Sequence, residues 1–198
     1  PTRPGLLYAG TETGMYVSFN GGDDWQSLQL NLPPVPVTDL SVRQGNLVAA
    51  TQGRAFWVLD DLFTIRQAAE DIDEKPLHVY SPGTVYTLGR RATASGFEGE
   101  NPSNDAQLYY YIRDEHEGPL SIDILDSDGN VVKHFSSEES DHDRCRIGNM
   151  DPRSPFEIEY PPAEKGLNKW SWNLKRENIT CIEDIALYVG FAGPQALP

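Results

Sequence analysis

The sequence LYAGTETGMYVSFNGGDDW, residues 7–25, decides how the rest of the chain is interpreted. Its first five residues, LYAGT at 7–11, recur as LVAAT at 47–51. A short polar step follows each copy, and then an aromatic segment, GMYVSF at 14–19 in the first and RAFWVLD at 54–60 in the second. The chain therefore contains an internal repeat of short apolar segments.

A period of about 40 residues, made of short strands, is typical of a β-propeller blade, which has four antiparallel strands. The pattern predicts about one and a half blades, linked by the proline-rich residues 33–36, where no ladder N–H is needed. The expected strands lie near residues 6–11, 14–19, 25–29, 37–43, 46–51 and 54–60. Blades bury their faces only against neighbouring blades, so the remaining blades of a parent propeller are expected partners.

The polar stretch SFNGGDDW, residues 18–25, separates two of these strands. A short side-chain oxygen at Asn20 can accept turn N–H groups, Gly22 can adopt positive φ, and Trp25 can cover the hairpin. We interpret it as a turn that stabilises the fold. A plain glycine-rich hairpin is the alternative.

The same stretch resembles the Asp-box, S-x-D-x-G-x-T-W, at Ser18, Gly22 and Trp25, with Asn20 at the Asp position and Asp24 at the Thr position. Residues 7–28 and 36–62 resemble the final blades of BNR-repeat glycosyl hydrolase-like and sortilin-type repeat proteins. GLNKWSWNLK, at 166–175, is similar to a strand of the Ig-like domain that follows those propellers. The resemblance implies that the protein is periplasmic or secreted. The motifs that carry it are structural, so they specify the architecture and not a chemical reaction.

An all-β fold is therefore predicted, with partial propeller blades, one short helix and an incomplete Ig-like β-sandwich. The helix is expected within DDLFTIRQAAED, residues 60–71, and the first part of residues 77–88 is expected to form the outer strand of the last blade. The predicted domains are residues 1–88, a linker at 89–106, and a sandwich at 107–198 that lacks its last strand. Exposed strand edges in this truncated repeat predict self-association.

Composition limits the partners. The chain has 198 residues, with 30 Asp and Glu against 16 Lys and Arg, and a formal net charge of −14. Such a field repels phosphate backbones, so nucleic acid is not expected. No long apolar run or signal peptide is present, so no membrane span is expected. Because the chain begins PTRPG without Met, we expect a piece of a longer protein.

No catalytic constellation can be assigned from the sequence, and no cofactor is expected. If the parent is a glycoside hydrolase, Arg54, Asp60 and Asp61 are the candidates for the rim of its active site. DSDGN, at 126–130, has the first spacing of a calcium loop at Asp126 and Asp128, but a hairpin turn is favoured.

Several other residues keep two interpretations. Cys145 and Cys181 are either bridged or separate thiols. The side chains of Trp57, Trp170 and Trp172 are better explained by packing in the core than by stacking on sugar rings. The acidic segment at residues 137–145 is better explained as a solvated loop than as a metal site.

The function predicted from the sequence is a non-catalytic structural or recognition role, with a glycan or protein as ligand. Two alternatives stay open. The segment belongs to a sialidase-like glycoside hydrolase whose active site lies mainly in missing blades, or it is a sortilin-like peptide-binding module.

Overall fold

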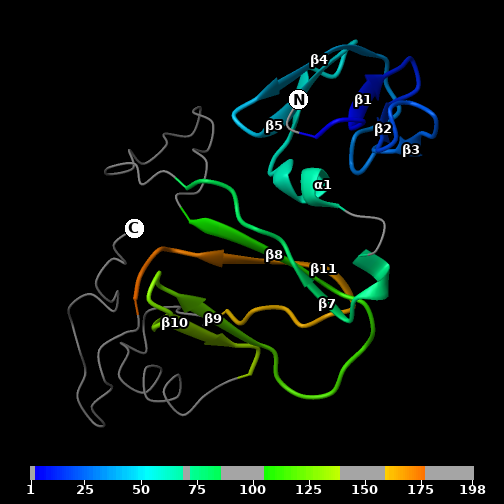
Figure 1. Ribbon diagram of the computed structural model, residues 1–198. Coiled ribbons are helices and arrows are strands. Elements are labelled where there is room, and N and C mark those ends of the chain that lie inside the picture. The colour runs from blue at the N-terminus through cyan, green and yellow to red at the C-terminus, as the bar shows by residue number, and fades with distance from the viewer. Residues whose placement is uncertain (1–2, 69–71, 86–104, 139–158, 177–198) are drawn as a thin grey trace, which may run out of the picture. The chain divides into compact units, whose positions relative to one another are not determined.

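The computed structural model describes residues 3–68, 72–85, 105–138 and 159–176 (Figure 1). These residues form an all-β protein with one α-helix, α1 at Phe63–Gln67, and one turn of 3₁₀ helix at Ile72–Glu74. The chain divides into two compact units, Pro1–Glu70 and Asp71–Pro198.

The first unit contains two antiparallel sheets of three strands, ordered β1-β2-β3 and β4-β5-β6. All six strands expected from the sequence are present, and β3 is the shortest. Their bounds are β1 Leu7–Gly10, β2 Met15–Ser18, β3 Gln26–Ser27, β4 Val37–Arg43, β5 Asn46–Thr51 and β6 Phe56–Leu59.

The two sheets approach each other where β4 begins. A Cβ atom added to Gly10 would lie 2.5 Å from Cγ1 of Val37, so only glycine leaves room for this side chain. The N–H of Val37 donates to the carbonyl of Thr11 at 2.9 Å, and the N–H of Gln52 donates to the carbonyl of Pro36 at 2.9 Å. The start of β4 is therefore held between the ends of β1 and β5.

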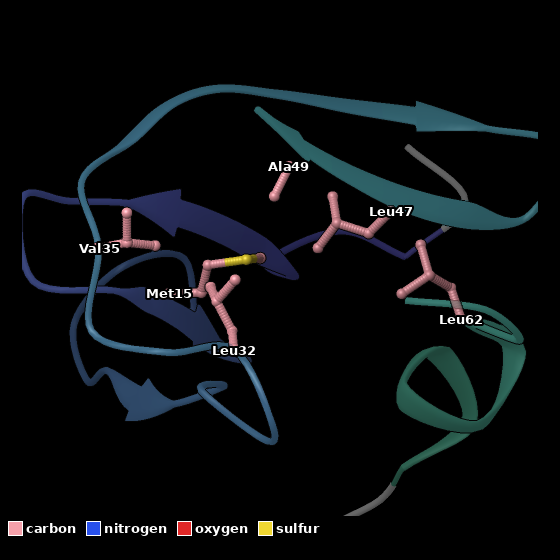
Figure 2. Close-up of a cluster of buried hydrophobic side chains, with 6 residues drawn as sticks. All are labelled: Met15, Leu32, Val35, Leu47, Ala49 and Leu62. Atoms are coloured by element: carbon pink, nitrogen blue, oxygen red, sulfur yellow. The ribbon is translucent and has the colours of Figure 1, made fainter. Parts of the chain in front are cut away.

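An apolar core joins these sheets to the segment before α1. Leu62 has no exposed surface, and 2% of Leu47 is exposed. Burying a leucine side chain stabilises a fold by about 1.5–3 kcal/mol. Figure 2 shows the six buried members of this cluster, contributed by β2, the segment between β3 and β4, β5 and the residue before α1: Met15, Leu32, Val35, Leu47, Ala49 and Leu62.

The second unit contains a three-stranded antiparallel sheet, ordered β11-β8-β7, and the β9–β10 hairpin. The rings of Phe135 on β10 and Trp170 on β11 meet edge to face, with their centroids 5.6 Å apart. That contact joins the hairpin to the sheet. The strands are β7 Leu77–Val79, β8 Ala106–Ile112, β9 Ser121–Leu125, β10 Val131–Ser136 and β11 Gly166–Trp172.

The expectation that the first part of residues 77–88 completes the last blade is wrong. β7 pairs with β8, with Leu77 opposite Ile112 and Val79 opposite Tyr110, and it belongs to the second unit. A strand of three residues carries little information about its partner, because pairing depends on which strand offers an open edge. After β6 the chain instead buries Leu62 and forms α1.

Candidate functional site

The polar turn at residues 18–25 is closed by hydrogen bonds between its own side chains and backbone. The Ser18 hydroxyl donates to Oδ1 of Asn20 at 3.0 Å and accepts the N–H of Gly22 at 2.9 Å. The same Oδ1 of Asn20 accepts the N–H of Asp24 at 3.0 Å. Two short side chains thus satisfy two backbone donors that the turn would otherwise leave without partners.

The substituted positions of the Asp-box pattern contact each other. Nδ2 of Asn20 donates to Oδ2 of Asp24 at 2.9 Å. In the Asp-box pattern, residue 20 would be an Asp and residue 24 a Thr, whose hydroxyl can donate to the Asp carboxylate. In this chain the donor is at residue 20 and the carboxylate acceptor at residue 24, so a side-chain hydrogen bond between the two positions remains.

The backbone and the indole complete the turn. Gly22 has φ of 106°, a conformation that favours glycine. Nε1 of Trp25 donates to the carbonyl of Gly22 at 3.0 Å, and 43% of this tryptophan stays exposed. The N–H of Gly21 donates to the carbonyl of Gly5 at 2.8 Å, which ties the turn to the residues before β1.

The second repeat reproduces the strand pairing of the first hairpin. Leu7, Tyr8, Ala9 and Gly10 pair with Ser18, Val17, Tyr16 and Met15. In the second repeat, Leu47, Val48, Ala49 and Ala50 pair with Leu59, Val58, Trp57 and Phe56. The second loop is one residue longer, yet the register from the strand ends is the same.

The hairpin ends also share their hydrogen bonds. The N–H and the hydroxyl of Thr11 both donate to the carbonyl of Gly14, at 2.9 and 3.1 Å. The N–H and the hydroxyl of Thr51 both donate to the carbonyl of Ala55, at 3.1 and 2.7 Å. The repeat seen in the sequence is therefore a repeat of local structure.

The three rim candidates lie at the two ends of β6. Arg54 is exposed in the loop before β6, whereas Asp60 and Asp61 follow the end of that strand. The four residues of β6 separate the two ends by about 13 Å. The backbone of Asp61 stabilises the first turn of α1, because its carbonyl accepts the N–H and the hydroxyl of Thr64 at 3.2 and 3.1 Å.

The calcium candidates lie in the turn between β9 and β10. Oδ1 of Asp126 accepts the N–H groups of Asp128 and Asn130 at 2.9 and 2.8 Å, and Gly129 has φ of 84°. The side-chain hydrogen bond from Asn130, aided by these backbone donors, lowers the pKa of Asp126 below its usual range. These carboxylate oxygens stabilise a hairpin turn, the arrangement favoured from the sequence.

The three tryptophans proposed for packing are each partly buried. Nε1 of Trp57 donates to the carbonyl of Arg54 at 3.0 Å, and Nε1 of Trp172 donates to the carbonyl of Lys175 at 2.9 Å. Trp170 packs on Phe135. Cys145, Cys181 and residues 139–145 of the acidic loop lie outside the described residues.

Three polar residues that position these elements were missed by sequence reasoning. Arg3 donates through Nη1 to the carbonyls of Ile65 and Arg66 at 3.1 and 3.2 Å, at the end of α1. Gln29 accepts the N–H of Met15 at 3.1 Å and donates to the carbonyls of Leu32 and Pro33 at 2.7 and 3.0 Å. Asn168, 5% exposed, donates to the carbonyls of Glu164 and Gly166 at 2.7 and 3.0 Å.

Two tyrosines have raised pKa values. Burial raises the pKa of Tyr110 to about 12, and its hydroxyl donates to the carbonyl of Pro162. Burial also raises the pKa of Tyr8, although the charges of Arg66 and Arg3 partly oppose this. Both phenols therefore stay protonated near neutral pH, and neither has the lowered pKa of an activated nucleophile.

Within the part of the chain that the structure describes, no three His, Cys, Asp or Glu side chains gather as a metal-binding group. None of the helices formed by those residues has the length and apolar character needed to span a membrane. No protein family, curated protein or solved structure shows significant similarity to the chain.

Proposed function

We propose that this chain is a non-catalytic structural and recognition part of an Asp-box β-propeller protein, in which its first unit supplies the closing blades and its second unit an Ig-like sandwich. The observation that carries the proposal is the hairpin built twice, by β1 with β2 and by β5 with β6, with the same register and the same threonine hydrogen bonds. The same strand pairing at an offset of about 40 residues is what blade repetition produces.

The order of the strands supports this assignment. β1, β2 and β3 form one antiparallel sheet, and β4 begins a second sheet in which β5 and β6 repeat β1 and β2. The Asp-box turn joins β2 to β3 within the first sheet. These elements correspond to the last three strands of one blade and the first three of the next.

The chemistry of the turn supports a structural role. The oxygens of Ser18 and Asn20 accept backbone N–H groups, and the carboxylate of Asp24 accepts from Asn20. A glycosidase needs two carboxylates about 5–10 Å apart across a sugar, one of them to hold or accept a proton. Ser18, Asn20 and Asp24 take part in closing the hairpin, and only one of the three is a carboxylate, so they offer no such pair.

Incubating the 198-residue chain with a panel of aryl-glycosides, including a sialoside, tests the proposal. We expect no release of the aryl group above that of a heat-unfolded sample. Hydrolysis that Asp60→Asn abolishes, with an unchanged circular dichroism spectrum, would show that the segment is part of a hydrolase. Glu12→Gln, an exposed acid of the β1–β2 loop, is the matched control.

Recognition needs a separate measurement. A glycan array and a peptide library, each incubated with the labelled chain, test for ligands. Reproducible binding by the folded chain supports the recognition role, and its absence limits the proposed function to architecture.

A further inference from the structure

The polar turn of residues 18–25 contains the only asparagine of the chain that is followed by a glycine, Asn20 before Gly21. Glycine has no side chain to hinder attack by its backbone nitrogen, so an Asn-Gly pair closes into a succinimide more readily than other asparagine pairs. Asn20 and Gly21 are both exposed, and a Cβ atom added to Gly21 would meet nothing within 4 Å. This peptide is therefore accessible to water.

Hydrogen bonds hold both groups that would react. The N–H of Gly21 donates to the carbonyl of Gly5 at 2.8 Å. Nδ2 of Asn20 donates to Asp24 at 2.9 Å, and Oδ1 accepts the Ser18 hydroxyl and the N–H of Asp24, each at 3.0 Å. Ring closure requires the Gly21 nitrogen to lose its proton and approach Cγ of Asn20. The contact with Gly5 therefore restrains the reaction in the folded chain.

The acceptor of that hydrogen bond lies in residues 3–5, which precede β1 and fit closely against the turn. A Cβ atom added to Gly5, where φ is 80°, would lie 3.2 Å from the carbonyl oxygen of Phe19 and 3.4 Å from the nitrogen of Gly21. Arg3 anchors the segment, because Nη1 donates to two carbonyls at the end of α1, at 3.1 and 3.2 Å. Its guanidinium also lies 5.2 Å from the ring centroid of Phe19.

We infer that Asn20 is a modification site, which deamidates spontaneously at a rate set by opening of the hydrogen bond from Gly21 to Gly5. Parts of a folded protein open locally with different free energies, and an exposed turn held by few contacts opens more readily than a core strand. Each opening frees the Gly21 nitrogen to react. The inference uses only the turn and the segment before β1, so it does not depend on the proposed function.

The reaction needs only water. The Gly21 nitrogen gives its proton to water and forms a bond to Cγ of Asn20. The Cγ–Nδ2 bond breaks, and the side-chain nitrogen takes up a proton and leaves as ammonia. Water then opens the succinimide at either carbonyl, which gives aspartate or isoaspartate at position 20. No atom is oxidised or reduced.

Both products weaken the turn. Aspartate loses the Nδ2 donor that now bonds to Asp24, and it places a second carboxylate against that residue, so like charges repel. Isoaspartate adds a methylene group to the backbone between residues 20 and 21, which displaces the groups that close the hairpin. Deamidation therefore converts a rare opening of the turn into a permanent loss of its stability.

Peptide mapping by mass spectrometry measures the conversion of Asn20 at neutral pH, in the folded chain and in concentrated urea. In urea, Asn20 should convert before the other asparagines, because it alone precedes a glycine. In the folded chain the rate should be at least about tenfold lower, because only the open fraction reacts. Asn31, which is exposed and precedes Leu32, is the internal reference and should convert far more slowly than Asn20 in urea.

Two variants loosen the contact from different directions. Arg3→Ala removes the anchor, and Gly5→Ala places a methyl group against Gly21 at a φ that favours glycine. Each should raise the rate in the folded chain about fivefold and leave the rate in urea unchanged. Hydrogen exchange at the Gly21 amide should accelerate in parallel, and circular dichroism reports the fold. Arg43→Ala, at an exposed arginine of β4, is the matched control and should change neither rate.

The unaltered chain supplies a test that needs no variant. At low urea concentrations, deamidation of Asn20 should rise in proportion to hydrogen exchange at the Gly21 amide. Equal rates in the folded chain and in concentrated urea would overturn the inference, as would deamidation that stays constant while this exchange accelerates. Conversion of Asn31 before Asn20 in urea would show that the Asn-Gly pair is not the reactive site.

Discussion

The two repeats of the first unit begin alike and end differently. In both, a leucine-led strand turns at a threonine and pairs with an aromatic strand in the same register. After β2 the chain forms the polar turn of residues 18–25 and returns as β3. After β6 it buries Leu62 and forms α1. Ser18 and Leu59 occupy the corresponding last positions of the paired strands.

The difference separates two kinds of stabilisation. The hairpin ends are closed by short-range hydrogen bonds, which depend only on local sequence and so recur with it. The path of the chain after each hairpin depends on a few residues. In the first repeat these are side chains whose oxygens accept turn N–H groups, and in the second an apolar side chain that enters the core. Among the described residues, a strand follows on the outer side of β2, where the polar turn redirects the chain, and none follows on the outer side of β6.

Leu62→Ala should have the largest effect. Its side chain is fully buried in the cluster of Figure 2, and truncating a buried leucine removes transfer free energy and leaves a cavity. We expect the free energy of unfolding of the first unit to fall by about 3 kcal/mol. Urea unfolding together with hydrogen exchange of β1 and β5 amides measures it. Leu30→Ala, at a residue 69% exposed, should change stability by less than about 0.5 kcal/mol.

Ser18→Ala should have the next largest effect, confined to the first repeat. The hydroxyl is fully buried, and its loss leaves the N–H of Gly22 without an acceptor and Oδ1 of Asn20 without one of its donors. An unsatisfied buried group costs about 1–3 kcal/mol, so we expect a loss of about 2 kcal/mol. Ser27→Ala, at an exposed serine of β3, is the control. Equal losses from both variants would show that the turn does not depend on Ser18.

The features that sequence predicted best are the local ones. Six strands, the positive φ of Gly22 and the hydrogen bond from Asp24 to Asn20 all depend on residues that are close to one another along the chain. Periodicity and turn chemistry act over that range.

Long-range contacts explain what was missed. Arg3 donates to carbonyls 62 and 63 residues away, and nothing beside it in the sequence indicates an acceptor. The partner of β7 could not be read from its own short sequence, because β8 begins only at Ala106, far beyond Val79. Arg54 and Asp60 are close in sequence, yet an extended strand between them keeps them apart.

Asn20→Asp tests whether the polar turn depends on the hydrogen bond that Asn20 donates to Asp24. The variant places a second carboxylate against Asp24, where Nδ2 of Asn20 now donates at 2.9 Å. Repulsion between like charges should lower stability by about 1 kcal/mol at neutral pH. Repulsion between the two carboxylates raises their pKa values in the folded state. The loss of stability caused by Asn20→Asp should therefore be small at acid pH, where one carboxyl is protonated, and should grow as pH rises and both ionise.

A second substitution gives this prediction its control. Asp24→Thr in the Asn20→Asp background restores the residues of the Asp-box pattern, and a threonine hydroxyl can donate to the new carboxylate. A double-mutant cycle should give a favourable coupling of about 1 kcal/mol. A coupling near zero at neutral pH would mean that residues 20 and 24 do not stabilise the turn through each other.

The smallest effects test the equivalence of the hairpins most directly. Thr11→Val and Thr51→Val each replace a hydroxyl that donates to the carbonyl across the loop with a methyl group of similar size. A hydrogen bond of this kind contributes about 0.5–1.5 kcal/mol, so each variant should lose about 0.7 kcal/mol, and the double variant about twice as much. Urea unfolding of the three variants measures the losses. Each site is the control for the other, but the Thr11 hydroxyl also accepts the N–H of Thr13 at 3.1 Å, so Thr11→Val should lose slightly more than Thr51→Val. A loss from Thr51→Val that exceeds the loss from Thr11→Val by more than about 1 kcal/mol would mean that the two hairpins are not equivalent.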